Sequence, residues 1–227
     1  MMFYSFKQLD ILLRHLWIIF FLIGYSVFGQ NSHEISDSTV RVGQQIWMSK
    51  NLSVDHFRNG DSIPEAVTKR QWRRAARNQE PAWCYYKNDS ELGALYGKLY
   101  NFYAIQDQRG LAPRGWRVAN EQDWLQLIES LGGDAEAGSK LKSILYWKEN
   151  QTGTDEFGFG GLPAGYRYHR GRFFSLGYYT AWWTSDVYGK YGAWVRPLFY
   201  NHGMTYRTSH FRGLGLSVRC VLENLGE

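Results

Sequence analysis

The chain has 227 residues and a formal net charge of +5 at pH 7, which is mildly basic and says little about a partner. Aromatic side chains make up 17% of it, including 10 tryptophans and 16 tyrosines, and this content excludes a disordered chain. With 24 glycines and only 5 prolines, the composition indicates a compact protein of short strands and glycine turns, long enough to bury a core without disulfides or metals.

Residues 1–29 are predicted to be a secretory signal. Lys7 and Arg14 supply a basic start, and Leu16–Phe28 follows as an uncharged apolar run. That run is too short to cross a hydrocarbon core of about 30 Å, which takes about 20 helical residues. Cleavage is expected before Gln30, and the alternative is a retained membrane anchor. The prediction places the protein in the periplasm, at the cell surface or outside the cell, with membrane contact only through the uncleaved segment.

A single domain is predicted to follow the signal. Residues 30–39 are polar and are expected to form a flexible leader, and residues 40–224 are expected to form the domain. Val40–Leu52 is predicted to open it as a pair of strands. Asn59-Gly60 then gives a strong turn signal.

A basic run lies within Thr68–Glu80, which is predicted to be helical. Most of its cations would share one helical face: Lys69, Arg70, Arg73, Arg74 and Arg77. One interpretation is a patch for an anionic surface such as lipid head groups, acidic glycan or nucleic acid. The other, which we favour from the sequence, is a solvated helical insertion.

Two helices are predicted in the middle of the domain. The first covers Leu92–Gln106, where apolar residues recur at helical spacing. The second covers Asn120–Leu131, with Asn120 at the N-cap, acidic residues in the first turn and Gly132 as the stop. Its Trp124 and leucines are predicted to be packing residues.

Shorter elements are predicted on either side of these helices. Pro81–Tyr86 is predicted to form a strand ahead of the first helix. A turn before the second helix is expected from Gly110, Pro113 and Gly115. Ala135–Trp147 is expected to be a loop with a short helix.

After Asn150, short apolar runs separated by glycines predict mostly antiparallel strands. A hairpin is expected between Tyr166–His169 and Arg172–Ser175, with its turn at Arg170-Gly171. Further strands are expected over Ala181–Ser185, Tyr191–Tyr200, Met204–Thr208 and Leu214–Leu222. Helices that come first and strands that come later favour an α+β fold over alternating β/α units.

The chain contains two cysteines, Cys84 and Cys220. Export to an oxidising compartment would allow a disulfide between them. Two buried free thiols are the alternative, and pairing cannot be read from sequence alone.

No catalytic constellation is present in the sequence. It lacks a G-x-S-x-G elbow, paired metal-binding histidines, a G-x-G-x-x-G fingerprint and a Walker loop. Asp155 and Glu156 are adjacent, so in a strand they would point to opposite faces and could not share one glycosidic bond. We therefore predict no catalytic residue, no metal ligand and no cofactor.

Aromatic and basic side chains crowd the C-terminal third instead. The ring faces of tyrosine and tryptophan can stack on sugar rings, and arginine can bind a carboxylate through two parallel hydrogen bonds. The candidate ligand-binding residues are Tyr166, Tyr168, Tyr178, Tyr179, Trp183, Asp186, Arg196 and Arg207. The alternative is that the aromatics are mainly structural. Trp182 and Trp183 would face opposite ways in a strand, so at least one of them is expected in the core.

Several blocks of the sequence resemble the Fibrobacter succinogenes major paralogous domain family. They are IWMSKNL (46–52), FRNGDSIP (57–64), YGKLYNFYAI (96–105), GLAPRGWRVANEQDWLQLIESLGG (110–133), AGSKLKS (137–143), FGFGGLPAGYR (157–167), AWWTSD (181–186) and GLSVRCV (215–221). These blocks follow the family order and span Val40 to Leu222. The resemblance implies an exported, surface-associated bacterial protein. The family often has Cys where Ala112 stands, which leaves Cys84 and Cys220 as the remaining partners for a bridge.

A more distant likeness joins Trp116–Leu131 and the closing GLSVRCV block to the C-type-lectin-like superfamily, which includes the formylglycine-generating enzymes. It implies two helices packed on short, mostly antiparallel strands with long loops. Those enzymes use a closely spaced cysteine pair, whereas Cys220 stands alone in its region. The calcium-binding motifs of true C-type lectins are also absent from the sequence.

These features predict an exported, non-catalytic binding or cell-surface module for a glycan or another envelope component. No nucleic-acid partner is expected. The alternatives are an enzyme of the formylglycine-generating-like superfamily and a structural envelope protein.

Overall fold

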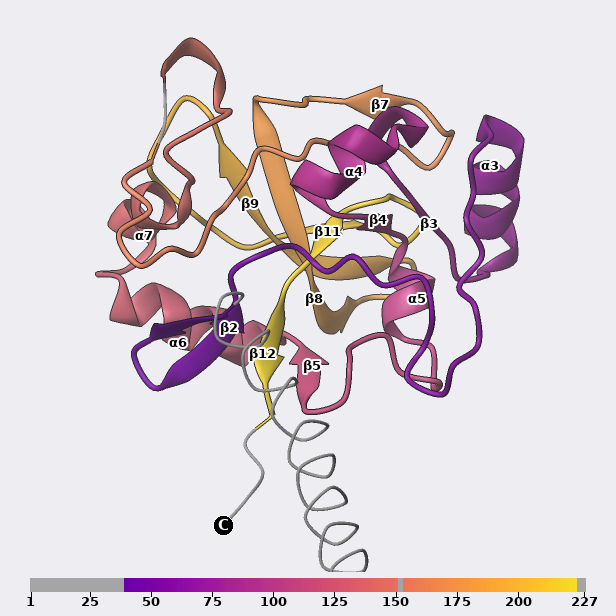
Figure 1. Ribbon diagram of the computed structural model, residues 1–227, viewed down its shortest axis with the longest axis horizontal. Helices are drawn as coiled ribbons and strands as arrows, with labels where there is room; N and C mark the ends of the chain where they lie inside the picture. The colour runs from indigo at the N-terminus through magenta and orange to yellow at the C-terminus, as the bar shows by residue number, and fades with distance from the viewer. Residues whose placement is uncertain (1–38, 151–152, 224–227) are drawn as a thin grey trace, which may run out of the picture. The chain divides into compact units, whose positions relative to one another are not determined.

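The computed structural model describes residues 39–150 and 153–223 (Figure 1). From Val40 onward these residues belong to one compact unit. No helix among them is long and apolar enough to cross a membrane. The predicted secretory signal, residues 1–29, lies outside the described part of the chain, as does all but the last residue of the predicted leader, residues 30–39.

One four-stranded sheet joins the beginning of the described chain to its end. Its strands, in spatial order, are β1 (Thr39–Val42), β2 (Gln45–Met48), β12 (Cys220–Leu222) and β5 (Trp116–Val118). The inner strand β12 pairs antiparallel with both β2 and β5, as Figure 1 shows. The strand pair predicted within Val40–Leu52 is confirmed by β1 and β2.

A second four-stranded sheet carries the longest strands. Its spatial order is β10 (Thr208–Phe211), β9 (Gly192–Phe199), β8 (Tyr179–Tyr188) and β11 (Ser217–Val218). β9 pairs antiparallel with both neighbours, whereas β11 runs parallel to β8. The predicted antiparallel character therefore holds for this sheet except at one edge.

Two short strand pairs complete the sheets of the described residues. β3 (Trp83–Cys84) pairs with β4 (Leu99–Tyr100), and β6 (Tyr166–Arg167) pairs with β7 (Phe173–Phe174), both antiparallel. The second pair confirms the hairpin predicted around Arg170-Gly171. Together with the helices, these sheets confirm the α+β class.

The helices of the described residues are α3 Lys69–Asn78, α4 Ser90–Tyr96, α5 Phe102–Ile105, α6 Glu121–Ser130 and α7 Asp134–Leu141, with 3-10 turns at η1 Tyr86–Asn88 and η2 Lys148–Asn150. Four of these helices, α3, α4, α5 and α6, begin at side-chain caps that the sequence supplies, whereas α7 begins after Gly133 without one. At α6, the Asn120 side chain accepts from the Asp123 backbone N–H, and the Asp123 carboxylate accepts from the Asn120 N–H. Thr68 and Gln71 form the same reciprocal cap at α3. Each cap satisfies amides that have no partner inside the helix.

The single helix predicted over Leu92–Gln106 is wrong, because the segment divides into α4, β4 and α5. Gly97 ends α4 with a φ of 77°, a conformation that glycine adopts readily. The backbone of Tyr100 then bonds to Leu216 in both directions, at 2.9 and 3.1 Å. Asn101 restarts the helix by accepting from the Ala104 N–H. Pairing with distant strands therefore overrides the local helical spacing.

The strand predicted over Met204–Thr208 is also wrong in its bounds, because β10 only begins at Thr208. The residues before it serve a different part of the fold. The Thr205 N–H donates to the Asp134 carbonyl at the start of α7, at 2.9 Å, and the Thr205 hydroxyl donates to Pro197. The first contact uses the Thr205 amide that a longer strand would need, and the second fixes its side chain against β9.

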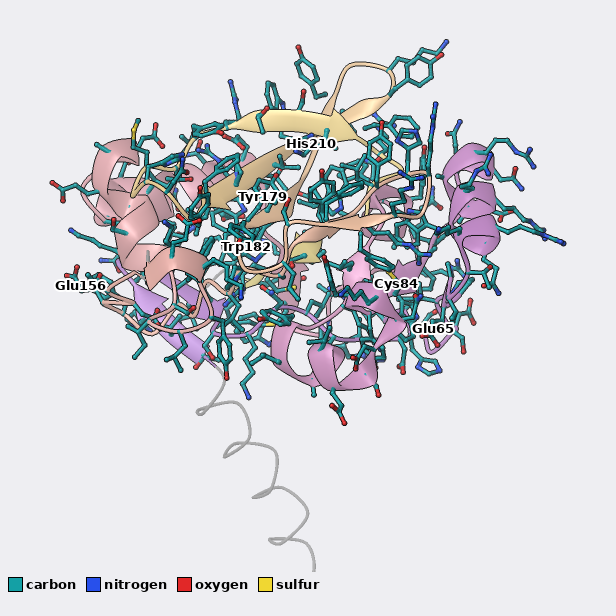
Figure 2. The ribbon with its side chains drawn as sticks, turned by 90° about the horizontal axis from the view of Figure 1, so that it is seen from above. Glu65, Cys84, Glu156, Tyr179, Trp182 and His210 are labelled. Carbon is teal, nitrogen blue, oxygen red and sulfur yellow. The ribbon has the colours of Figure 1, made fainter. Side chains whose placement is uncertain are left out.

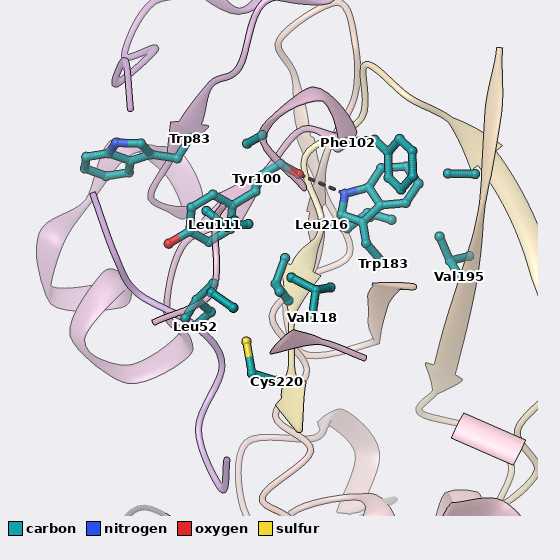
Figure 3. Close-up of a cluster of buried hydrophobic side chains, with 14 of the residues drawn as sticks. Leu52, Trp83, Tyr100, Phe102, Leu111, Val118, Trp183, Val195, Leu216 and Cys220 are labelled. Atoms are coloured by element: carbon teal, nitrogen blue, oxygen red, sulfur yellow. Dashed lines mark hydrogen bonds between the residues drawn. The ribbon is translucent and has the colours of Figure 1, made fainter. Parts of the chain in front are cut away.

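Both faces of β8 are buried over its first six residues, so Trp182 and Trp183 each lie fully inside the protein. Trp182 belongs to one apolar cluster and Trp183 to another. In the cluster of Figure 3, the indole N–H of Trp183 donates to the Tyr100 carbonyl at 2.9 Å, and its ring packs on Phe102. The expectation that at least one of these tryptophans is in the core is confirmed for both.

We expect Gly138→Ala to destabilise the protein although the residue lies inside helix α7. Alanine in a helix interior ordinarily stabilises it by about 1 kcal/mol relative to glycine. At Gly138, however, an added Cβ would lie 2.5 Å from the Gly203 carbonyl oxygen and 2.7 Å from that of Met204. Because backbone atoms cannot rotate away, we expect a net loss of about 1–3 kcal/mol in unfolding free energy.

Urea unfolding of the Gly138→Ala protein measures this loss. Glu136→Ala is the matched control, since Glu136 is exposed on the same helix, and loss of its first-turn charge and its ion pair with Lys140 should cost less than about 1 kcal/mol. A Gly138→Ala protein that is more stable than the parent would show that α7 does not approach the 203–204 backbone this closely.

Candidate ligand-binding site

An aromatic cavity of about 670 Å³ lies beside the second sheet, and we call it the tyrosine cavity. Its walls come from the β6–β7 hairpin, the turn that leads into β8, the end of β9, and β10 with the loop before it. Six of the lining residues are tyrosines: Tyr166, Tyr168, Tyr178, Tyr179, Tyr200 and Tyr206. This volume lies within the range typical of small-molecule sites, about 300–1,000 Å³.

A tight turn before β8 sets the direction of two neighbouring tyrosines. The backbone N–H groups of Tyr178 and Tyr179 both donate to the Ser175 carbonyl, at 3.0 and 3.1 Å. Tyr178 is left 40% exposed at the rim, whereas Tyr179 is only 8% exposed and forms the floor. The turn fits against the hairpin because Gly165 has no side chain, and a Cβ there would lie 2.5 Å from the Phe174 carbonyl oxygen.

The floor of the tyrosine cavity is polar but uncharged. The Tyr179 ring packs edge-on against Phe199 and Tyr166, with ring centroids 4.9 and 5.7 Å apart. Its hydroxyl lies 3.2 Å from Nε2 of His210. Figure 2 labels both residues, Tyr179 on β8 and His210 on β10. Burial raises the pKa of Tyr179 and lowers the pKa of His210, so both side chains are neutral at pH 7. The pair can therefore exchange hydrogen bonds with a neutral ligand without burying a charge.

The rim of the cavity presents fixed aromatic faces to solvent. Tyr206 stacks on Phe199 with ring centroids 5.9 Å apart and planes inclined by 14°. Tyr178 meets Tyr200 edge-on at 5.1 Å. Since these packed neighbours restrict the ring orientations, the rim can stack on a flat apolar surface with little loss of side-chain entropy.

Half of the residues predicted for ligand binding line this cavity, namely Tyr166, Tyr168, Tyr178 and Tyr179. The structure places the other four elsewhere. Trp183 is a core residue without solvent exposure. Asp186, Arg196 and Arg207 gather instead around the first residue of α6.

These three charged residues surround Glu121. Arg196 is nearly buried and forms an ion pair with the Glu121 carboxylate. Asp186 accepts the Glu121 backbone N–H at 2.7 Å, which adds a second acidic cap to α6. Arg207 lies 3.8 Å from the same carboxylate and packs over the Trp194 ring at 4.1 Å. The three side chains therefore bind other parts of the protein and hold β8, β9 and α6 together.

The sequence did not predict the other nine lining residues, which include His210 on the floor and Tyr206 at the rim. His210 follows Thr208 by two positions in β10, so period-two alternation would have placed both on one face of that strand. Tyr206 comes from the loop before β10, and no local pattern marks its position.

Both cysteines are free and buried in the structure, which is the second of the two alternatives that the sequence left open. Cys84 lies in the cluster beneath α3, and Cys220 lies in the cluster of Figure 3. Burial raises the pKa of the Cys84 thiol to about 11 and that of Cys220 to about 12. Neither thiol is a ready nucleophile at neutral pH. Among the described residues, no group of three or more His, Cys, Asp or Glu side chains is placed to hold a metal ion.

Comparison with known proteins identifies the family. The Fibrobacter succinogenes major domain matches residues 40–222. It is a family of uncharacterised paralogous domains for which no catalytic function is indicated. No curated protein and no solved structure matches the chain. Because the match covers most of the sequence and agrees with the motif blocks, this protein belongs to the Fibrobacter succinogenes major domain family.

Proposed function

We propose that this protein is an exported, non-catalytic binding module at the bacterial cell surface, and that it recognises a glycan through the tyrosine cavity. The observation that carries the proposal is the cavity itself, where exposed tyrosine faces surround an uncharged hydrogen-bonding floor. The proposed export rests on the basic and apolar character of residues 1–29.

A sugar ring matches the two kinds of surface in the cavity. Its axial C–H groups form an apolar face that can stack on an aromatic ring, and Tyr168, Tyr178 and Tyr206 offer such faces at the rim. Its hydroxyl groups both donate and accept hydrogen bonds, as the neutral Tyr179 and His210 pair does. A glycan would therefore satisfy the floor and the rim together.

The proposal includes a C-type-lectin-like fold. It is supported by the sheet that joins β1 and β2 to the closing strand β12, by the pairing of β12 with β5 just ahead of helix α6, and by the long connections around the second sheet. In this arrangement the capped helix α6 belongs to the packed frame. The segments around β6, β7 and β10 then carry the binding surface.

A glycan array probed with the full chain tests the function. We expect binding that falls by about 10- to 100-fold when Tyr178 and Tyr206 are both replaced by alanine, because two stacking contacts are lost. Tyr179 is unsuitable for this test, since its buried ring also supports Phe199 and its loss would disturb the fold.

The matched control replaces Tyr188 and Tyr191 by alanine. Both are well exposed and neither lines the cavity, so glycan binding should be unchanged. Equal binding by the two double variants, or no binding of any glycan by the parent protein, would contradict the proposal.

A further inference from the structure

We infer that the glycan is an acidic polysaccharide whose anionic groups bind along a basic groove that α3 forms beside the tyrosine cavity. This inference rests on the proposed function and names the substrate class of that site. We call this second hollow the arginine groove. Its cationic residues are Lys69, Arg70, Arg73, Arg74, Arg77 and Arg170.

The arginine groove and the tyrosine cavity are neighbours. The groove measures about 1160 Å³ and shares His169 and Phe211 with the cavity wall. The two shared rings meet edge-on with centroids 5.3 Å apart, so they form a single ridge between the hollows. A polymer that lies in the cavity can continue over this ridge along α3.

The fold holds α3 firmly at this position. Trp72 is fully buried and packs directly on Gly215. A Cβ at Gly215 would lie only 2.8 Å from the Trp72 ring, so glycine is needed for this contact. Ala76 packs on Gly213 in the same way, because a Cβ added to Gly213 would lie 2.8 Å from the Ala76 methyl group. The helix is therefore anchored through its apolar face, and its charged face is fixed along the groove.

The charges of α3 are poorly compensated within the protein. The helix contains no acidic residue, and its first turn places Lys69 and Arg70 at the positive end of the helix dipole. Three pairs of like charges stand four residues apart, which destabilises an isolated helix: Lys69 with Arg73, Arg70 with Arg74, and Arg73 with Arg77. An anion bound along this face would relieve that repulsion.

Ion pairs leave most of these cations available. In residues 39–150 and 153–223, the only ion pair of the groove's cations joins Arg74 to Glu80, at 3.9 Å and at the exposed surface. The two ridge residues add no charge to the groove. Phe211 is apolar, and burial and the adjacent Arg170 lower the pKa of His169, so its ring is neutral at pH 7. The groove thus offers a row of arginines to carboxylate or sulfate groups.

A polysaccharide with regularly spaced acidic groups fits both hollows at once. Its ring faces suit the tyrosine rim, and its anionic substituents suit the cations spaced along α3. Neutral glycans would leave the arginine groove unused. Anionic lipid and nucleic acid would engage the cations without matching the uncharged floor of Tyr179 and His210.

Two matched pairs of probes test the inference on the full chain by isothermal titration calorimetry. The first pair is oligogalacturonate and its methyl ester, and the second is dextran sulfate and dextran. We expect the acidic member of at least one pair to bind about tenfold more tightly than its neutral partner, with a preference that weakens as salt increases.

Replacing Arg70, Arg73 and Arg77 by glutamine should remove this preference while leaving affinity for the neutral partner unchanged. The control, with Arg41, Lys50 and Arg114 replaced by glutamine, loses the same charge at exposed positions that line neither hollow. It should keep the preference. Thermal melts of both variants verify that each remains folded.

The outcomes separate the two proposals. Equal affinity for acidic and neutral partners, lost in the Tyr178 and Tyr206 variant, would overturn the inference and leave glycan binding intact. No binding of any of the four probes would overturn the inference alone, because the glycan array decides whether the tyrosine cavity binds a glycan at all. Anionic vesicles or single-stranded DNA that bind as tightly as the acidic glycan would overturn the inference in favour of unselective polyanion binding.

Discussion

Replacing Trp182 by alanine is expected to lower the free energy of unfolding by about 3–5 kcal/mol, the largest effect we expect from truncating one core residue. Trp182 lies at the centre of an aromatic cluster, stacked on Trp124 at 5.4 Å and edge-on to Phe159 at 5.7 Å. Its removal leaves a cavity that rigid neighbouring rings cannot fill. The indole N–H also donates to Oδ1 of Asn51 at 2.7 Å, and this hydrogen bond would be lost.

Urea unfolding followed by circular dichroism measures the effect of Trp182→Ala. Tyr188→Ala is the matched control, because Tyr188 lies on the same strand and is 49% exposed. It should cost less than about 1 kcal/mol. A similarly small cost for Trp182→Ala would show that the cluster does not stabilise the fold.

The parts of the fold that the sequence predicted are those with a local cause. The capped helix α6 needs only Asn120, Asp123 and a glycine stop, and all lie within one short segment. The hairpin at Arg170-Gly171 likewise depends on a turn and two adjacent runs. Such elements can be read without knowledge of the tertiary structure.

The failures have a distant cause. Leu99 and Tyr100 leave the predicted helix because β3 and Leu216 supply strand partners that the local spacing does not reveal. Arg196 is oriented by Glu121, a residue 75 positions earlier, so a sequence pattern could not separate a structural arginine from a ligand-binding one. Aromatic density found four tyrosines of the cavity, but the place of Tyr206 depends on how its loop folds.

The ion pair of Arg196 with Glu121 provides the second large effect. We expect Arg196→Met to lower the unfolding free energy by about 3–5 kcal/mol at pH 7, since breaking a buried pair leaves an uncompensated charge. Methionine keeps much of the side-chain volume of arginine, so the lost unfolding free energy comes mainly from the missing positive charge and not from lost packing. Arg207 at 3.8 Å is largely exposed to solvent and would compensate only weakly. Thermal or urea unfolding at fixed pH gives the value.

The pH dependence distinguishes this charge effect from lost packing. Burial already raises the pKa of Glu121 above its usual 4.5, and removal of Arg196 should raise the pKa further. Between 4.5 and the raised value, the folded protein binds more protons than the unfolded chain, so its stability falls as pH rises. The loss caused by Arg196→Met should therefore be larger at pH 8 than at pH 5.

Adding Glu121→Gln should abolish that difference, because no carboxylate then remains to titrate. A loss that is equal at both pH values would mean that Glu121 does not carry a buried charge in the folded protein.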